Sequence, residues 1–534
     1  MKSTTSQSLR PRRKDPTARL LSLPWLWQDW GVFPFFTCQV LSPVQSTPPK
    51  GPPLSSMETT IKPASPALPR EVVVVLAILV VSAMIMILNE TILSVALPSI
   101  MEDFRIPETT AQWLTTGFML TMAVVIPTTG YLLDRFSTKT IFVTALLFFL
   151  VGTFVAALAP TFAVLLTARV IQAIGTALIM PLLMTVTLTV VPTERRGAVM
   201  GIISIVISVA PALGPTVSGF ILNSLTWHWL FWIMLPIVAV TFIVGTLLIE
   251  NIGENRISPL DIPSVLLSAV AFGGLVYGFS SIGAVLNGDS MTGIVVIIVG
   301  ATALAIFIRR QLQLGRQDRA LMDLRPFRIR NFTFALVAIL LAFGAMLGTV
   351  MVLPIYLQTS LGVTALVTGL VVMPGGLLQG LVAPFIGRFY DKVGPRPLLI
   401  PGAILLTAAA WSFTFLNSST PVEMVVGLHI VFSIGMCLMM TPLMTTALGS
   451  LPRILYGHGS AILNTLQQLA GAAGTAIMIA ALSLGTVLAS NAGSAQAEAV
   501  AAGARTAFIA GAVIATIALV ASLFVTRVEE TEAA

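Results

Sequence analysis

The feature that most constrains this chain is a series of fourteen apolar stretches, most of them about 20 residues or longer, separated by short polar breaks. Only 10% of the 534 residues are charged, against about 25% in soluble proteins. The chain therefore has too little polar surface to cover these stretches in a water-soluble fold. Backbone groups in hydrocarbon must bond within the chain, and apolar stretches of this length do so as helices. The sequence therefore predicts an all-α integral membrane protein with fourteen transmembrane helices. The predicted spans are residues 72–97, 111–133, 140–159, 162–191, 198–222, 228–249, 262–284, 291–308, 332–358, 364–387, 398–416, 422–449, 459–488 and 504–526.

The basic residues set the predicted orientation. Of 29 Lys and Arg residues, all but Arg105, Arg169 and Arg505 lie before the first stretch, after the last one, or in loops that follow an even-numbered stretch. Because cytoplasmic loops hold the excess of Lys and Arg, we expect a multi-pass protein of the cytoplasmic (inner) membrane with both termini in the cytoplasm. The pI of about 9.8 then reflects topology and attraction to membrane lipid, and nucleic acid is not an expected partner.

Residues 1–70 are rich in Pro, Ser and Thr, and we expect them to form a disordered cytoplasmic leader. The aromatic run at 20–40 is interrupted too often by Pro and polar residues to span a membrane. An alternative is that translation starts at Met57, which would leave a short tail before the first helix.

One short pattern occurs twice, 257 residues apart. Each copy has Gly, three residues, Asp, a basic residue, and a second basic residue four positions later. The copies consist of Gly130, Asp134, Arg135 and Lys139, and of Gly387, Asp391, Lys392 and Arg396. The repeat predicts two six-helix halves at 71–250 and 331–526, two inserted helices with a basic cytoplasmic loop at 251–330, and a tail at 527–534. Parallel repeats of this kind are typical of transporters.

These repeats resemble the loop signature Gly-x-x-x-Asp-Arg-x-Gly-Arg-Lys of the major facilitator superfamily. Further stretches resemble its fourteen-helix drug:proton antiporters, and among them the lincomycin-resistance type of exporter; these are residues 88–98, 112–121, 169–175, 210–219 and 458–468. The chain departs from the family pattern at Ser137, Ala173 and Ser218, where glycine is usual. The resemblance implies a major facilitator fold, alternating access, and protons as the coupling ion with no other cofactor.

Two charges lie well inside predicted spans: Glu90 in the first and Arg169 in the fourth, each about 10 Å from the outer end. A charge at the centre of a membrane helix costs at least about 2.5 kcal/mol on insertion scales, so each one requires a reason. We expect Glu90 to load and release a proton, with Arg169 favouring its ionised form in one conformation. A static ion pair between two helices is the alternative. The resemblance supports proton coupling, because related antiporters place carboxylates and an arginine in these helices.

The first repeat suggests a gate. Asp134 could accept hydrogen bonds from the N-terminus of a helix in the other half, where the helix dipole favours an anion by about 0.3 to 1 kcal/mol. The predicted partner is the thirteenth helix, which starts near Gly459, and Arg135 and Lys139 would steady the carboxylate. The alternative is an ordinary positive-inside turn with no moving role.

The fifth predicted helix contains Pro211, Gly214, Pro215 and Gly219. Proline removes a backbone hydrogen bond and glycine lets another helix approach closely, so ordinary kinking and packing would account for them. In the family that the chain resembles, this Gly-Pro signature distinguishes antiporters from symporters, which favours export.

Polar or aromatic residues within or at the ends of the spans are candidates for a substrate cavity, although hydrogen bonding between helices is at least as common a role for each polar one. They are Asn89, Gln112, Trp113, Gln172, Gln379, His429, Asn464, Gln467 and Gln468. The offset of 257 also predicts that Gln172 and His429 occupy equivalent positions.

Other function classes find little support in the sequence. None of the six lysines follows a glycine, so no phosphate-binding Gly-Lys-Ser/Thr loop exists, and catalytic motifs such as His-Glu-x-x-His are missing. Three scattered histidines and two distant cysteines, Cys38 and Cys437, predict neither a metal site nor a disulfide. We therefore expect no enzyme but a proton-coupled antiporter, working as a monomer, that exports small amphipathic drugs. Export of an endogenous lipid or secreted metabolite is the alternative, and a channel is less well supported.

Overall fold

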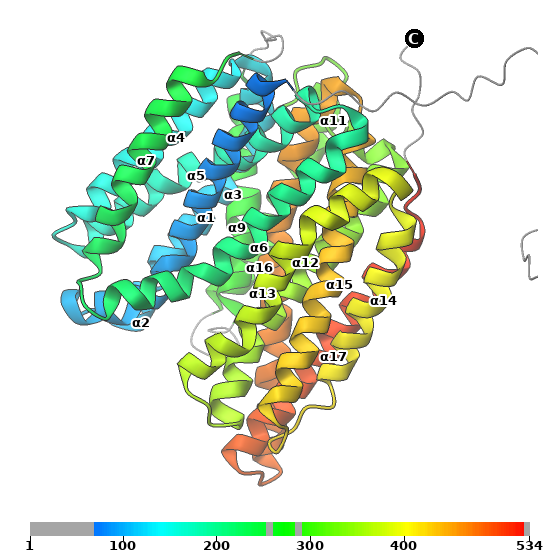
Figure 1. Ribbon diagram of the computed structural model, residues 1–534. Helices are drawn as coiled ribbons and strands as arrows, with labels where there is room; N and C mark the ends of the chain where they lie inside the picture. Colours follow the sequence, from blue (N-terminus) through cyan, green and yellow to red (C-terminus); the bar gives the residue numbers. More distant parts are fainter. Residues whose placement is uncertain (1–68, 252–259, 283–290, 528–534) are drawn as a thin grey trace, which may run out of the picture. The chain divides into compact units, whose positions relative to one another are not determined.

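The computed structural model describes residues 69–251, 260–282 and 291–527, and every regular element in them is helical (Figure 1). The first half contains α1 (Arg70–Phe104), α2 (Glu108–Ala111), α3 (Trp113–Arg135), α4 (Thr138–Ala157), α5 (Phe162–Val190), the 3-10 helix η1 (Thr193–Arg195), α6 (Arg196–Leu222) and α7 (His228–Leu248). The inserted part contains α8 (Ile262–Ser268), the π-helix η2 (Ala269–Gly273), α9 (Gly274–Ser280), α11 (Thr292–Gly315) and η3 (Arg325–Arg328). The second half contains α12 (Arg330–Ile355), η4 (Tyr356–Ser360), α13 (Ala365–Val393), α14 (Arg396–Phe413), α15 (Val422–Gly449), η5 (Arg453–Leu455), α16 (Tyr456–Asn491) and α17 (Gln496–Leu523).

Within these residues, thirteen helical segments are long and apolar enough to cross a membrane. The 27-residue α6 lies at the position of the fifth predicted span. The all-helical membrane fold is therefore confirmed. The predicted leader, with Cys38 and Met57, lies outside the described residues.

Several boundaries differ from the predicted ones, because polar residues continue helices beyond the apolar stretch. α13 runs on to Val393, so Asp391 and Lys392 lie in its last turn, and Asp134 and Arg135 end α3 in the same way. The repeated motif is therefore a helix end more than a loop. α17 begins at Gln496, before the predicted span 504–526, so Glu498 and Arg505 both lie inside this helix.

Side-chain caps fix several of the helix starts. The hydroxyl of Ser137, one of the departures from the family pattern, accepts a hydrogen bond from the backbone N–H of Thr140 at the start of α4. Thr161 and Thr364 cap α5 and α13 in the same manner. Such caps satisfy backbone donors that have no partner within the helix.

The two halves meet along two seams, α6 against α13 and α3 against α16. Glycines allow the close approach at the first seam: a Cβ on Gly387 would lie 2.0 Å from the carbonyl oxygen of Gly197. The inserted helices pack on the second seam, where α9 contacts both α3 and α16 (Figure 1). The described part of the insertion therefore covers the seam of α3 with α16.

Candidate functional site

Arg169 is the largest fully buried side chain among the described residues, with 1% of its surface exposed. Its Nη1 donates hydrogen bonds of 3.0 Å to Asn89 Oδ1 of α1 and to Gln172 Oε1 of its own helix α5. Gln172 in turn donates to the hydroxyl of Thr153 in α4, at 2.9 Å. The guanidinium lies over the ring of Phe118 in α3, 4.1 Å from its centroid. Four helices of the first half therefore converge on one cation.

Glu90 is the neighbour of Asn89 in α1 and is half-buried. The hydrogen bonds of Arg169 go to Asn89 and Gln172 and not to this carboxylate. On the other side of Glu90, Thr91 contacts Gly214 of α6 so closely that a Cβ on Gly214 would lie 2.2 Å from its hydroxyl. In sequence, Glu90 thus lies between a residue bonded to Arg169 and a residue in close contact with α6. Helix α6 also contains Pro211, Pro215 and Gly219.

The remaining cavity candidates lie on α3, α13, α15 and α16. Gln112 and Trp113 lie exposed at the start of α3, where Trp113 stacks on Tyr277 of α9 with ring centroids 5.8 Å apart. Asn464 donates to the backbone of its own helix, and Gln468 contacts the sulfur of Met122 at 4.0 Å. Gln379 and Gln467 are half-buried in α13 and α16.

His429 is buried in α15, and its ring lies against Gly375 of α13. α5 begins at Phe162 and α15 at Val422, an offset of 260, because the connections between helices differ in length in the two halves. This register makes His429 the equivalent of Arg169 and corrects the predicted match with Gln172.

The second repeat caps a helix of the opposite half. Asp391 of α13 accepts hydrogen bonds from the backbone N–H groups of Gly197 and Ala198, at 2.7 and 2.9 Å. These residues belong to the first turn of α6. A carboxylate at this place neutralises backbone donors and complements the positive end of the helix dipole.

The first repeat makes the corresponding contact across the other seam. Asp134 lies at the first turn of α16, where its Oδ2 is 3.1 Å from Nε2 of His458. Gly130, one turn earlier in α3, is also in direct contact with His458. Sequence analysis predicted the start of this helix as the partner of Asp134 but missed the side chain of His458. Only the packing of α3 on α16 reveals that contact.

Three more bonds join the halves near this end, which we call the motif end. Arg196 donates to the hydroxyl of Tyr456 at 3.0 Å, and the hydroxyls of Ser204 and Thr441 lie 3.0 Å apart. A third pair, Thr185 and Ser460, lies 3.1 Å apart. The offset of 260 could have revealed that Arg196 and Tyr456 are equivalent residues, but not that they touch. The motif end is closed in this conformation.

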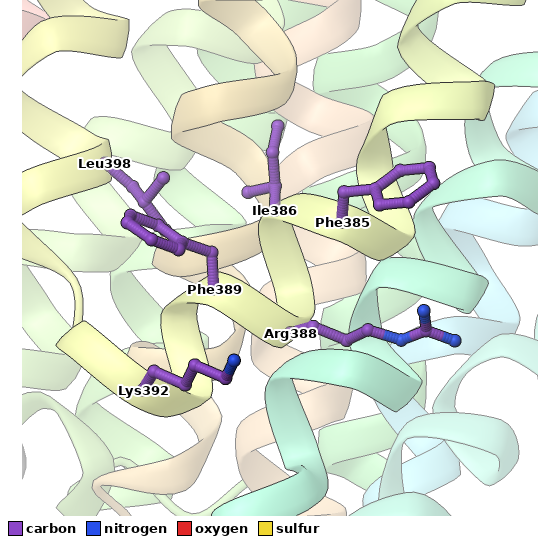
Figure 2. A pocket seen from close by; sticks show the side chains of 6 residues that line it. All are labelled: Phe385, Ile386, Arg388, Phe389, Lys392 and Leu398. Carbon is purple, nitrogen blue, oxygen red and sulfur yellow. The ribbon is translucent and has the colours of Figure 1, made fainter.

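One surface groove, of about 420 Å³, lies on α13 and the start of α14 (Figure 2). Its lining residues are Phe385, Ile386, Arg388, Phe389, Lys392 and Leu398. Phe385 and Phe389 are 66% and 49% exposed, so the groove opens on the surface of the protein and not toward its interior. None of the predicted cavity residues lines it, and it is not the predicted substrate cavity.

No group of three or more His, Cys, Asp or Glu side chains suited to a metal ion occurs among the described residues. The polar clusters are instead small, buried and shared between helices. Two helical halves joined through matched helix ends, in a chain with this many membrane-spanning segments, define a multi-pass membrane transporter.

The chain belongs to the Major Facilitator Superfamily, whose sequence profile matches residues 79–475. It is 42% identical to the lincomycin resistance protein LmrB of Listeria innocua, over 85% of this chain and 96% of that protein. It is 27% identical to a multidrug resistance protein B homolog of Mycobacterium tuberculosis, over 73% and 72% of the two chains. Among solved structures it resembles the human organic anion transporter MFSD10, with a TM-score of 0.59 and 15% identity, over 84% of this chain and all of that one. These matches confirm the family that the motifs predicted.

Proposed function

We propose that this protein is a proton-coupled antiporter that exports amphipathic drugs, with lincosamides as the first compounds to test. The observation that carries the proposal is the match to a lincomycin resistance protein over 96% of its length. The multidrug resistance relative supports more than one drug as substrate. The few charges inside the spans favour neutral or monocationic apolar compounds among them. A susceptibility panel on cells that overexpress the chain tests this directly: resistance to at least one lincosamide is expected, and unchanged susceptibility throughout the panel contradicts drug export.

Glu90 is the proposed proton carrier. It is half-buried and follows Asn89, which accepts a hydrogen bond from Arg169. It also precedes Thr91, which makes the tight contact of α1 with α6. A proton gained or lost here changes the net charge beside a buried guanidinium, and that change can bias how α1 packs. In inverted vesicles, Glu90→Gln should abolish drug uptake driven by a pH gradient while insertion stays normal. Unchanged antiport would remove Glu90 from the mechanism.

The motif end is the proposed inner gate of an alternating-access cycle. Asp134 and Asp391 each reach the first turn of a helix in the other half, and these contacts must break before a cavity opens at that end. Asp134→Asn should slow turnover and leave drug binding near normal, because the carboxylate is far from the Arg169 cluster in sequence and packing. A normal transport rate would count against the gate.

The alternative is export of an endogenous lipid or secreted metabolite, with drug resistance as a side activity. The same panel, combined with profiling of secreted compounds in a deletion strain, separates the two. A monomer in the cytoplasmic membrane, with both termini inside, is part of the proposal.

A further inference from the structure

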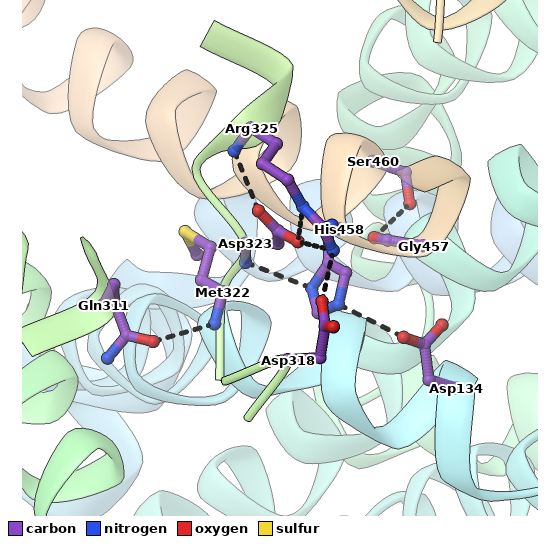
Figure 3. Close-up of polar contacts among 9 residues, drawn as sticks. All are labelled: Asp134, Gln311, Asp318, Met322, Asp323, Arg325, Gly457, His458 and Ser460. Atoms are coloured by element: carbon purple, nitrogen blue, oxygen red, sulfur yellow. Dashed lines mark hydrogen bonds and ion pairs between the residues drawn. The ribbon is translucent and has the colours of Figure 1, made fainter. Parts of the chain in front are cut away.

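The inserted part of the chain touches the proposed gate through one side chain, His458. Asp134 lies 3.1 Å from its Nε2, and the backbone N–H of Asp323 points to its Nδ1 at 3.4 Å (Figure 3). Asp323 belongs to the segment 316–329 that joins α11 to α12. Both His458 and Asp323 are buried, with 8% and 4% of their surfaces exposed. One imidazole therefore bridges the first half and the inserted segment.

The inserted helices hold this segment in place. Gln311 of α11 accepts a hydrogen bond from the backbone N–H of Met322 at 3.2 Å, and it donates to Ser264 of α8 at 2.7 Å. Ser264 donates to Asp261, which also forms a two-point ion pair with Arg310 at 2.7 and 2.8 Å. A continuous chain of polar contacts thus runs from α8 and α11 to the residue next to Asp323.

The equivalent position in the other half has no such bridge. Gly197 and Ala198 correspond to Gly457 and His458 in the register of the helix starts, and there Asp391 bonds to backbone N–H groups directly. The inserted helices pack on the α3 and α16 seam that contains His458. The side-chain bridge and the insertion therefore occur together, on one seam.

We propose that His458 is a positioning residue through which the inserted segment controls the inner gate. The N–H of Asp323 requires a lone pair on Nδ1, so the proton of a neutral ring is on Nε2, where it donates to Asp134. The segment thereby sets the tautomer and aims the ring at the gate carboxylate. This inference rests on the proposed function of Asp134 in the gate and assigns a role to the inserted helices.

Charged groups flank the ring on both sides. Asp134 lies against Nε2 from α3, and on the other side Arg325 pairs with both Asp323 and Asp318 in the inserted segment. The ring therefore joins the carboxylate of Asp134 to a segment whose own charges are paired.

Two substitutions separate the two sides of the ring. In His458→Gln the amide reaches the place of Nε2 and can still donate to Asp134 but cannot accept from Asp323. In His458→Asn the amide reaches only the place of Nδ1 and can accept from Asp323 but cannot donate to Asp134. Gln311→Met is the third variant, because it releases Met322 without touching the ring. Opening is read from Asn464→Cys, one turn beyond Ser460 in α16, in a chain with Cys38→Ser and Cys437→Ala. A membrane-impermeant maleimide is added to inverted vesicles with equal pH on both sides.

We expect His458→Asn and Gln311→Met to label about 5- to 10-fold faster than the parent, as the loss of one hydrogen bond allows. His458→Gln, which keeps the donor to Asp134, should label more slowly than His458→Asn. Parental labelling rates in His458→Asn and Gln311→Met would overturn the role of His458. If Asp134→Asn also leaves labelling and transport unchanged, the gate itself is wrong; if only the His458 and Gln311 variants are silent, the gate stands and this inference fails.

Discussion

Arg196 and Tyr456 are the first residues of equivalent helices in the two halves, and they bond to each other across the interface at 3.0 Å. The guanidinium also lies 5.4 Å from the centroid of the tyrosine ring and donates to the carbonyl oxygens of Leu188 and Val191. The starts of α6 and α16 thus meet at the motif end, and the arginine ties them to the end of α5. The pseudo-symmetry axis of the molecule passes close to this contact.

Tyr456→Phe should weaken the closed motif end. The ring stays beneath Arg196, but a hydrogen bond to a charged group is lost, and even about 1.4 kcal/mol would shift the conformational equilibrium tenfold. We expect faster maleimide labelling of Asn464→Cys from the cytoplasmic side. Tyr390→Phe is the matched control, since its hydroxyl bonds to Thr446 within the second half and should leave labelling unchanged. Equal labelling in parent and Tyr456→Phe would show that this bond does not hold the halves together.

Asn89→Leu should destabilise the first half. It removes one of the two side-chain acceptors of Arg169, whose Nε is already buried without a hydrogen-bond partner among the described residues. A buried charged group that loses a hydrogen-bond partner lowers the free energy of unfolding by about 1 to 3 kcal/mol or more. The melting temperature in detergent should fall, and Asn89→Asp, which keeps the acceptor oxygen, should fall less. A melting temperature of Asn89→Leu equal to that of the parent is the result that contradicts this.

Two glycines of α6 should respond in opposite ways to alanine. A Cβ at Gly214 would lie 2.2 Å from the Thr91 hydroxyl and 3.2 Å from its backbone, whereas a Cβ at Gly219 meets nothing within 4 Å. Overpacking costs about 1 to 3 kcal/mol, so Gly214→Ala should lower stability and disturb transport. Gly219→Ala should be neutral or slightly stabilising, since alanine favours a helix over glycine. Thermal unfolding of both variants, with drug efflux, tests the contrast, and similar losses in both would refute it.

The ion pair that joins the inserted helices should make stability depend on acid. The hydrogen bond from Arg310, with those from Ser264, lowers the pKa of Asp261 from 3.8 to about 2 in spite of partial burial. Because the folded-state pKa is below the ordinary value, the contribution to stability is full above about pH 4 and is lost as the pH falls through about 2. Asp261→Asn should therefore melt below the parent by a constant margin from pH 8 to 5, and the margin should shrink below pH 4.

The control for this pH series is Asp318→Asn, because the side chain of Asp318 is 76% exposed and should contribute little at any pH. A margin that does not change with acid would mean that Asp261 acts only as the cap of α8.

The sequence alone was sufficient for the fold class, the number of spans and the family. These depend on apolar length and on short motifs, which are local properties. The buried cation at Arg169 and the two motif carboxylates, Asp134 and Asp391, were also predictable as residues that need a reason, since charge is costly in a membrane and the motif repeats. Helix ends were less predictable, because charged residues such as Lys392 and Glu498 lie in helices beyond the apolar stretch.

The partners of these residues depended on the tertiary structure. Glu90 and Asn89 are adjacent in sequence, and only the rotation of α1 about its axis decides which of them Arg169 contacts. The equivalence of His429 with Arg169 follows from where α5 and α15 begin, and loop lengths conceal it. His458 contacts both Asp134 and Asp323 because α3, α16 and the inserted segment pack on one another. The position of a residue along its helix indicates its depth in the membrane. Which residues touch across helices depends on the rotation and register of each helix, and these are fixed only when all the helices pack together.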